Sequence, residues 1–174
     1  MTLVPILTAA LAGAPAGAPE QVSHLFEQHL VAPPDRVLPL LTPLGERAWA
    51  PAWNPQMRWE PPGGGAGTLF VTRHPGHPET VWVLDTWEPT LGHVHYTHVT
   101  PGSDVTEIDI HLRPDGPAGT VATVRYTWTA LGPAGVHLVR SKTPESYVRD
   151  MREWETELNQ YLRRQSPTTG RAAP

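Results

Sequence analysis

The chain has 174 residues, of which 39% are hydrophobic and 17% are charged, and its formal net charge at pH 7 is −4. This length is sufficient for one domain with a core, and the sequence has no clustered basic run of the kind that predicts a nucleic-acid partner. There is no cysteine, which excludes disulfides, zinc–thiolate sites and a cysteine nucleophile.

The first 20 residues are rich in alanine, glycine and proline and include a short apolar run without lysine or arginine. We interpret residues 1–20 as a flexible leader of a cytoplasmic protein; the alternative is a signal peptide and therefore an exported protein. Residues 21–165 are predicted to form a single domain, and residues 166–174 a disordered tail. The sequence has no stretch that reads as an integral membrane segment.

The first predicted strand spans residues 22–31, and the prolines after it end it because proline cannot donate to a sheet ladder. Residues 34–49 carry apolar side chains at helical spacing, but Pro39 and Pro43 interrupt them, which predicts two short helices. A weak strand is expected at 57–59, before a flexible glycine-rich loop.

The middle of the chain alternates apolar and polar side chains with a period of two, which is typical of strands. Short, turn-rich segments separate these strands, and such short connections predict an antiparallel meander. The predicted strands are residues 67–74, 80–88, 93–99, 105–112 and 120–131.

One long helix is predicted at 143–164, with Thr143 as its N-cap and Pro144 in its first turn. Its apolar residues form a single stripe that must be buried, and the large available partner is one face of the sheet. We therefore predict an α+β helix-grip fold, in which a curved antiparallel β-sheet wraps around the long C-terminal helix and two short helices follow the first strand. The stripe consists of Tyr147, Met151, Trp154, Leu158 and Tyr161.

Histidine is concentrated around the strand at 93–99, and the alternation along this strand predicts where each ring points. Tyr96 and His98 belong to the inward face, whereas His93 and His95 belong to the outward face. The histidines are therefore expected to serve two different surfaces.

A trial register places Val99 opposite Val105 on the next strand, across the short turn between them. A shift of two residues would keep the faces but change the partners. The outward cross-strand pairs that this register predicts are His95 with Asp109 and His93 with His111.

The strand at 80–88 lies on the other side of these histidines in the predicted meander. Asp85 and Trp87 are expected to point outward, with Asp85 flanking His95 and Trp87 beside His93. The inward side chains of this strand are then Trp82, Leu84 and Thr86.

The outward group of His93, His95, Asp109 and His111 offers nitrogen and carboxylate ligands for a divalent metal. The alternative is a solvated sheet face with favourable histidine–carboxylate pairs, each contributing about 0.2–1 kcal/mol. A flat, exposed face gives a metal little support from surrounding groups. We therefore expect these residues to bind no tight structural metal, and we expect no cofactor.

Several stretches resemble a known superfamily: "APPDRVLPLL" after the first strand, "LGERAWAPAWNP", "ETVWVLDTWEP", "VTPGSDVTEIDIHL", "GTVATVRYTWTAL" and the closing helix with Trp154. Through them, residues 22–164 resemble the SRPBCC or START-like superfamily, which includes polyketide cyclases and aromatases, lipid-transfer domains and pollen-allergen-type carriers. The stretch around Trp49 and Trp53 resembles a bacterial subgroup. The resemblance implies a cavity between sheet and helix, without a universal catalytic motif.

The predicted function is non-covalent binding or transport of a small hydrophobic or aromatic ligand in that cavity. His98, the polar member of the inward set, is a candidate to orient the ligand or to act as an acid/base; the alternative is a core histidine satisfied by a tyrosine or a backbone carbonyl. The predicted ligand-binding residues are Trp82, Leu84, Tyr96, His98, Ile108, Ile110, Tyr126, Trp128, Tyr147, Met151 and Trp154.

Two other classes of function stay open. One is an enzyme similar to polyketide cyclases and aromatases, with His98 as acid/base, and a second inward acid or base beside His98 would favour it. The other is a protein-interaction module similar to the chaperone-activator members of the superfamily, which a contiguous exposed aromatic patch would favour. A monomer and a homodimer are both compatible with the sequence.

Overall fold

A computed structural model describes residues 20–76 and 78–165. The tail expected at 166–174, and all but the last residue of the leader expected at 1–20, lie outside the described residues. Within them, seven strands form one antiparallel sheet in the order β1-β7-β6-β5-β4-β3-β2. The strands are β1 (Gln21–Leu30), β2 (Gln56–Trp59), β3 (Thr68–Thr72), β4 (Thr80–Glu88), β5 (His93–Thr100), β6 (Asp104–Asp115) and β7 (Gly119–Ala130).

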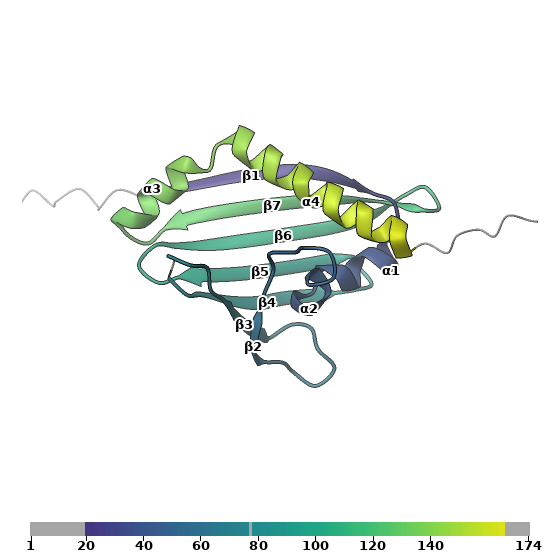
Figure 1. Cartoon of the computed structure of the whole chain (residues 1–174), viewed down its shortest axis with the longest axis horizontal. Helices are drawn as coiled ribbons and strands as arrows, with labels where there is room; N and C mark the ends of the chain where they lie inside the picture. The colour runs from purple at the N-terminus through teal and green to yellow at the C-terminus, as the bar shows by residue number, and fades with distance from the viewer. Residues whose placement is uncertain (1–19, 77, 166–174) are drawn as a thin grey trace, which may run out of the picture.

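The predicted helix-grip arrangement is confirmed: helices lie over one face of the sheet, and α4 runs along its β1–β7 side (Figure 1). Short helices follow the first strand, and a 3₁₀ turn at Pro39 separates them because proline interrupts regular helical hydrogen bonding. No helix of the described residues is long and apolar enough to cross a membrane. The helices are α1 (Pro34–Val37), η1 (Leu38–Leu41), α2 (Pro43–Glu46), α3 (Pro133–Ser141) and α4 (Pro144–Gln165).

Polar side chains fasten α4 to β1, which is an edge strand of the sheet. The Asn159 side chain accepts a hydrogen bond from the Val31 N–H at 2.9 Å and donates one to the His29 carbonyl at 2.8 Å. The Gln28 side chain donates to the Met151 carbonyl at 3.0 Å. The two Asn159 bonds satisfy backbone groups that an edge strand otherwise leaves unpaired, and the Gln28 bond ties β1 to a backbone carbonyl of α4.

The apolar stripe of α4 completes this packing. Its buried members include Met151 and Leu158, and Leu162 extends it at the C-terminal end. Thr143 caps the helix as predicted, since its hydroxyl accepts the Ser146 N–H at 3.2 Å. The helix therefore holds one edge of the sheet through both apolar burial and backbone hydrogen bonds.

Helix α3 was not among the predicted elements. It has only nine residues, which is too short a stretch for its apolar side chains to establish a helical periodicity in the sequence. Its Gly135 lies so close to the turn between β5 and β6 that an added Cβ would come within 1.8 Å of the Ser103 carbonyl oxygen. This close approach seats α3 against the end of the sheet, directly before α4.

The predicted register between β5 and β6 is confirmed. Val99 pairs with Val105, and the outward pairs form as expected because a one-residue slip would exchange the buried and exposed faces of β5. On the inward face, Trp82 of β4 pairs with His98. The confirmed outward pairs are His95 with Asp109 and His93 with His111.

The predicted faces of β4 are wrong beyond Asp85, because the register shifts between Leu84 and Thr86. One extra residue in β4 reverses the alternation from that point on. Thr86 therefore pairs with the outward His95, and Trp87 turns inward, where it is partly buried against the core. Instead of Trp87, Glu88 lies opposite His93.

Burial of the α4 stripe predicts the effect of a substitution within it. Leu158 is 2% exposed, so Leu158→Ala should lower the free energy of unfolding by about 2–5 kcal/mol through lost burial and a new cavity. Urea denaturation of both proteins measures the difference. The matched change Gln160→Ala, on the exposed side of the helix, should stay within about 0.5 kcal/mol. Equal losses in the two variants would contradict this orientation of α4.

Candidate ligand-binding site

Aromatic rings occupy much of the space between the sheet and the helices. Phe70 of β3 and Trp82 of β4 stack with ring centroids 5.5 Å apart. Trp53, which follows α2, meets both rings edge-on at 5.7 and 5.3 Å. Its indole N–H donates to the Pro43 carbonyl at 2.8 Å, so its polar end is satisfied while its ring is available for packing.

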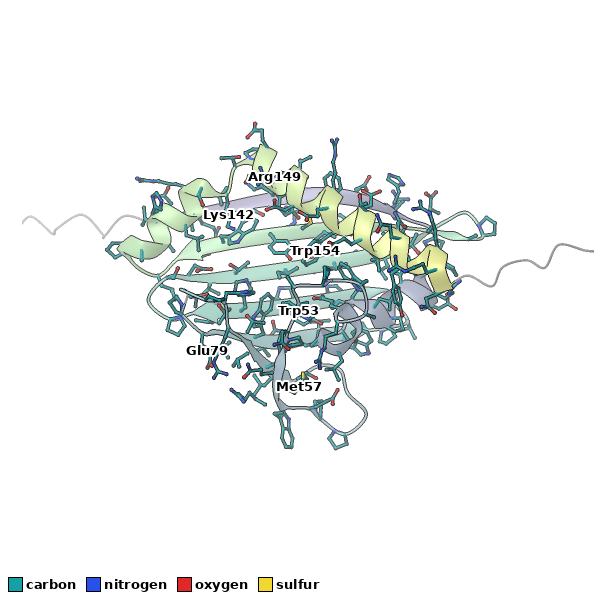
Figure 2. The ribbon with its side chains drawn as sticks, viewed as in Figure 1. Trp53, Met57, Glu79, Lys142, Arg149 and Trp154 are labelled. Carbon is teal, nitrogen blue, oxygen red and sulfur yellow. The ribbon has the colours of Figure 1, made fainter. Side chains whose placement is uncertain are left out.

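A second aromatic contact links the helical segment to α4. The Trp154 ring packs edge-on against Trp49 at 5.6 Å, and the Trp49 indole N–H donates to the Leu40 carbonyl at 2.8 Å. Figure 2 shows Trp154 and Trp53 extending over the same face of the sheet, from α4 and from the loop after α2. The two segments thus meet over the middle of the sheet through tryptophan side chains.

These rings leave a small internal cavity of about 40 Å³. A water molecule needs roughly 10–15 Å³ in this measure, whereas sites for drug-sized ligands hold roughly 300–1,000 Å³. The internal space between sheet and α4 is therefore filled mainly by the protein's own aromatic side chains. The cavity is lined by Glu46, Trp53, Phe70, Trp82, Tyr96, Ile108, Ile110, Tyr126 and Trp154.

Two open recesses adjoin the cavity and share lining residues with it. The recess beside α3 has a volume of about 280 Å³, and the recess beside α2 about 440 Å³. Trp154 lines all three spaces, while Tyr126 is shared with the first recess and Glu46 with the second. We call the cavity and its two recesses together the aromatic cleft.

The structure brings ten of the eleven predicted ligand-binding residues to the aromatic cleft. Leu84 is instead 1% exposed and packed in the core, so it lines none of the three spaces. Six residues line the internal cavity: Trp82, Tyr96, Ile108, Ile110, Tyr126 and Trp154. The recess beside α3 adds His98, Trp128, Tyr147 and Met151.

His98 points inward as predicted and lies against Trp82, with ring centroids 4.1 Å apart. Its Nδ1 is buried and has no hydrogen-bond partner among the described residues, so neither a tyrosine nor a carbonyl satisfies it. Burial lowers the pKa of His98 to about 4, and the nearby Asp104 charge opposes this shift only in part. His98 is therefore a neutral imidazole at pH 7.

Asp104 is a second inward acid near His98 that sequence reasoning missed. It is 1% exposed and lines the same recess, and its carboxylate accepts hydrogen bonds from the Ser103 hydroxyl at 2.8 Å and the Thr106 hydroxyl at 2.9 Å. Asp104 is the first residue of β6, where the alternation that assigns faces begins, so the pattern gave little signal for it. Both of its carboxyl oxygens therefore have hydrogen-bond donors.

Glu46 at the end of α2 is the other polar residue that sequence reasoning missed. Its side chain lines both the internal cavity and the recess beside α2, and its carboxyl makes no hydrogen bond within the described residues. Burial raises the pKa of Glu46 well above its usual value of 4.5. A four-residue helix is too short for periodicity to indicate which side chain faces inward.

The tyrosines of the cleft differ in whether their hydroxyls have hydrogen-bond partners. Tyr96 donates to the Leu41 carbonyl at 2.7 Å, and Tyr147 donates to the Val124 carbonyl at 2.9 Å. Within the described residues, the Tyr126 hydroxyl has no such partner. Among the described residues, the buried side-chain atom of the cleft that lacks a partner is thus the His98 Nδ1, while the Glu46 carboxyl and the Tyr126 hydroxyl make no side-chain hydrogen bond.

The opposite face of the sheet carries the outward histidines. The His93 Nε2 lies 2.7 Å from one carboxylate oxygen of Asp109, and the His111 Nε2 lies 3.2 Å from the other. The His95 Nδ1 is instead 3.1 Å from Asp85. The predicted outward orientation is confirmed, and the predicted flanking of His95 by Asp85 is confirmed with it.

Comparison with known proteins places this geometry in context. No family model and no curated protein matches the sequence. Among solved structures, norcoclaurine synthase from Thalictrum flavum in complex with dopamine and hydroxybenzaldehyde is 14% identical, with a TM-score of 0.64 over 96% of this chain and 100% of that chain. The Mll3558 protein from Rhizobium loti is 15% identical, with a TM-score of 0.58 over 83% and 99% of the two chains.

A third neighbour, CalU16 from Micromonospora echinospora, is 20% identical, with a TM-score of 0.53 over 83% of this chain and 77% of that chain. The chain has the helix-grip fold that these solved structures share. The resemblance that the sequence predicted is therefore confirmed for the fold. Function rests on the side chains that this helix-grip scaffold presents in its cleft.

The neutral state of His98 predicts how the helix-grip domain responds to acid. Between its ordinary pKa of 6.5 and its folded-state pKa of about 4, the unfolded chain binds more protons at this position. The free energy of unfolding should therefore fall as pH decreases through this range, by up to about 3 kcal/mol from this group. His98→Gln should lack this component in denaturation curves measured across the range. The exposed His137→Gln serves as control, and parallel curves for wild type and His98→Gln would contradict the assignment.

The raised pKa of Glu46 predicts a pH dependence of stability with the opposite sign. Its folded-state pKa is raised, so above the ordinary value of 4.5 the folded chain binds more protons than the unfolded chain. Stability should fall as pH rises from that value, because the carboxyl resists ionisation in its buried position. Glu46→Gln should become progressively more stable than wild type with rising pH, as measured by chemical denaturation. The same change at the exposed Glu107 should leave the difference constant; a constant difference for Glu46→Gln would refute its buried, protonated state.

Proposed function

We propose that the chain binds a small, largely apolar aromatic molecule in the aromatic cleft without covalent chemistry. The observation that carries this proposal is the combination of aromatic walls with the buried His98 Nδ1, which lacks a hydrogen-bond partner within the described residues. A buried polar atom without a partner destabilises a protein, so its presence in this cleft supports a partner that arrives from outside.

The protonation states in the cleft favour a neutral ligand. Burial raises the pKa of the Glu46 carboxyl, which favours its hydrogen-bond-donating form, and His98 offers an unpaired ring nitrogen. The charge of Asp104 and the Asp150 side chain on the rim disfavour an anion. A ring with a carbonyl or hydroxyl group suits this set, since its oxygen can accept a hydrogen bond from Glu46.

The volume of the cleft indicates where such a ring would lie. The recess beside α3, with about 280 Å³, is close to the lower end of common ligand sites, whereas the internal cavity is far smaller. Tyr126 and Trp128 stack on one wall of this recess at 5.2 Å, and Lys142 lies over Trp128 at its rim. Trp154 separates the recess from the internal cavity, so a modest rotation of its partly buried ring would join the two spaces.

The norcoclaurine synthase complex contains dopamine and hydroxybenzaldehyde, which are small aromatic molecules with polar substituents like the ligand proposed here. We therefore choose hydroxybenzaldehyde as the polar test ligand and N-phenyl-1-naphthylamine as an apolar fluorescent probe. Both should bind the wild-type chain with one saturable site.

Glu46→Leu tests the polar anchor. Loss of one hydrogen bond to a neutral ligand costs about 0.5–1.5 kcal/mol, so the affinity for hydroxybenzaldehyde should fall about threefold to tenfold, while the apolar probe should bind equally well or better. Titration calorimetry and probe fluorescence measure the two affinities. Glu107→Leu, on the outer face, should change neither. Absence of saturable binding of either compound to wild type would refute the proposed function.

Acid–base catalysis is the second candidate function, and one observation favours it. Burial within the cleft shifts two pKa values in opposite directions: it raises the pKa of the Glu46 carboxyl and lowers the pKa of the His98 imidazole to about 4. Such divergence is how acid and base roles are assigned in many enzymes. It fits the cyclase- or aromatase-like alternative, with Glu46 added to His98.

Measurements on the same proteins distinguish non-covalent binding from catalysis. Turnover of aromatic polyketide-type ketones would be followed in wild type, His98→Gln and Glu46→Gln, with probe binding measured in parallel. A positioned acid or base contributes about 10²–10⁴-fold to a rate, so catalysis requires a loss of that size in both variants with probe binding retained. Probe binding without turnover in wild type supports non-covalent binding alone.

A further inference from the structure

We propose that His93, Asp109 and His111, on the outer face of the sheet, bind one divalent transition-metal ion of the kind that prefers imidazole nitrogen, represented by Zn²⁺. The sequence alone predicted no tight metal there, because a flat sheet face gives a metal little support. Two features of the folded chain change that expectation: the convergence of the three side chains, and the position of Glu88 behind one of them.

The three potential ligands converge because of strand register. His93 on β5 and His111 on β6 are direct cross-strand partners, and their rings stack in parallel with centroids 4.2 Å apart and planes within 8°. Each ring directs its Nε2 toward Asp109, at 2.7 and 3.2 Å from the two carboxylate oxygens. Two imidazoles and one carboxylate thus point to a common position.

The spacing of these atoms is compatible with coordination to one ion. The ligand atoms all lie within 4.8 Å of one another. Zinc bonds of about 2.0–2.2 Å to nitrogen and oxygen place the ligands of a tetrahedral ion roughly 3–4 Å apart. To coordinate one ion in place of the present hydrogen bonds, the two stacked imidazole rings must rotate toward one another, because each nitrogen lone pair lies in the plane of its ring.

Glu88 supplies the support that a bare sheet face lacks. The register shift in β4 places Glu88 opposite His93, and its carboxylate lies 3.3 Å from the His93 Nδ1. A carboxylate that accepts the Nδ1 proton leaves Nε2 as the metal-binding nitrogen and fixes the ring orientation. The same arrangement is typical of histidines that bind zinc.

The chemistry of the group selects the class of ion. Two imidazoles with one carboxylate suit Zn²⁺, Cu²⁺ or Ni²⁺, whereas Mg²⁺ and Ca²⁺ prefer oxygen ligands. The His111 side chain is 55% exposed, so solvent can complete the coordination. His95 lies apart from this group, because Asp85 holds its Nδ1 and also accepts a hydrogen bond from Thr97.

Titration calorimetry of the full chain with zinc chloride tests the proposal. Wild type should bind one equivalent with a dissociation constant in the micromolar range, and zinc should raise its melting temperature because it binds the folded state. His111→Ala and His93→Ala should each weaken binding at least tenfold and remove the thermal shift. Far-UV circular dichroism without metal checks that the variants keep their fold.

Two further variants make the ligand assignment specific. Glu88→Gln should keep one site but weaken it about tenfold, as expected of a group that orients a ligand. His95→Ala, a neighbouring histidine on the same face, should leave the affinity unchanged. No saturable binding to wild type, unchanged binding in both His93→Ala and His111→Ala, or equal loss in His95→Ala would each overturn the proposed site. The aromatic cleft lies on the other face of the sheet, so this result and the ligand-binding result are independent.

Discussion

The alternation of side chains along β5 is the constraint on which both candidate sites depend. Successive residues of a strand face opposite sides, so Tyr96 and His98 enter the aromatic cleft while His93 and His95 face outward. β5 lies between β4 and β6 and is hydrogen-bonded on both edges. A slip by one residue would exchange the two faces, and burial of the Tyr96 face prevents it.

The aromatic cleft combines close packing with polar groups that packing does not satisfy. Tryptophan rings from α4 and from the segment after α2 bury the floor of the cleft. Burial disfavours charge, and it therefore raises the pKa of Glu46 and lowers the pKa of His98. Asp104 is also buried, and two hydroxyl groups donate hydrogen bonds to its carboxyl oxygens.

The fold and the contents of its cleft are separate properties. Structures that share the helix-grip fold with this chain are 14–20% identical to it, so the scaffold is common while the side chains within it differ. In this chain Trp53, Phe70 and Trp82 pack together where the fold could leave open space. Ligand access therefore depends on the recesses and on the ring of Trp154, which borders all of them.

On the outer face of the sheet, a local irregularity in β4 changes which side chain lies beside His93. The histidines of β5 and β6 are where the sequence pattern puts them, but their carboxylate neighbours depend on the register shift in β4. Without that extra residue, Trp87 would lie beside His93; with it, Glu88 does. A single inserted residue thus replaces an apolar neighbour with a hydrogen-bond acceptor.

The sequence by itself determined the antiparallel meander between residues 67 and 131, the capped helix α4 with its apolar stripe, the pairing of β5 with β6 and the outward position of His93 and His111. These follow from local periodicity and a short turn, which act between residues that are close along the chain. Tertiary structure alone decided the short helix α3, the shifted register of β4, the inward position of Glu46 and the small volume of the cavity. Each of these depends on how distant segments pack against one another. Periodicity indicates which residues share a face of a strand or helix, but it does not indicate which segment packs against that face.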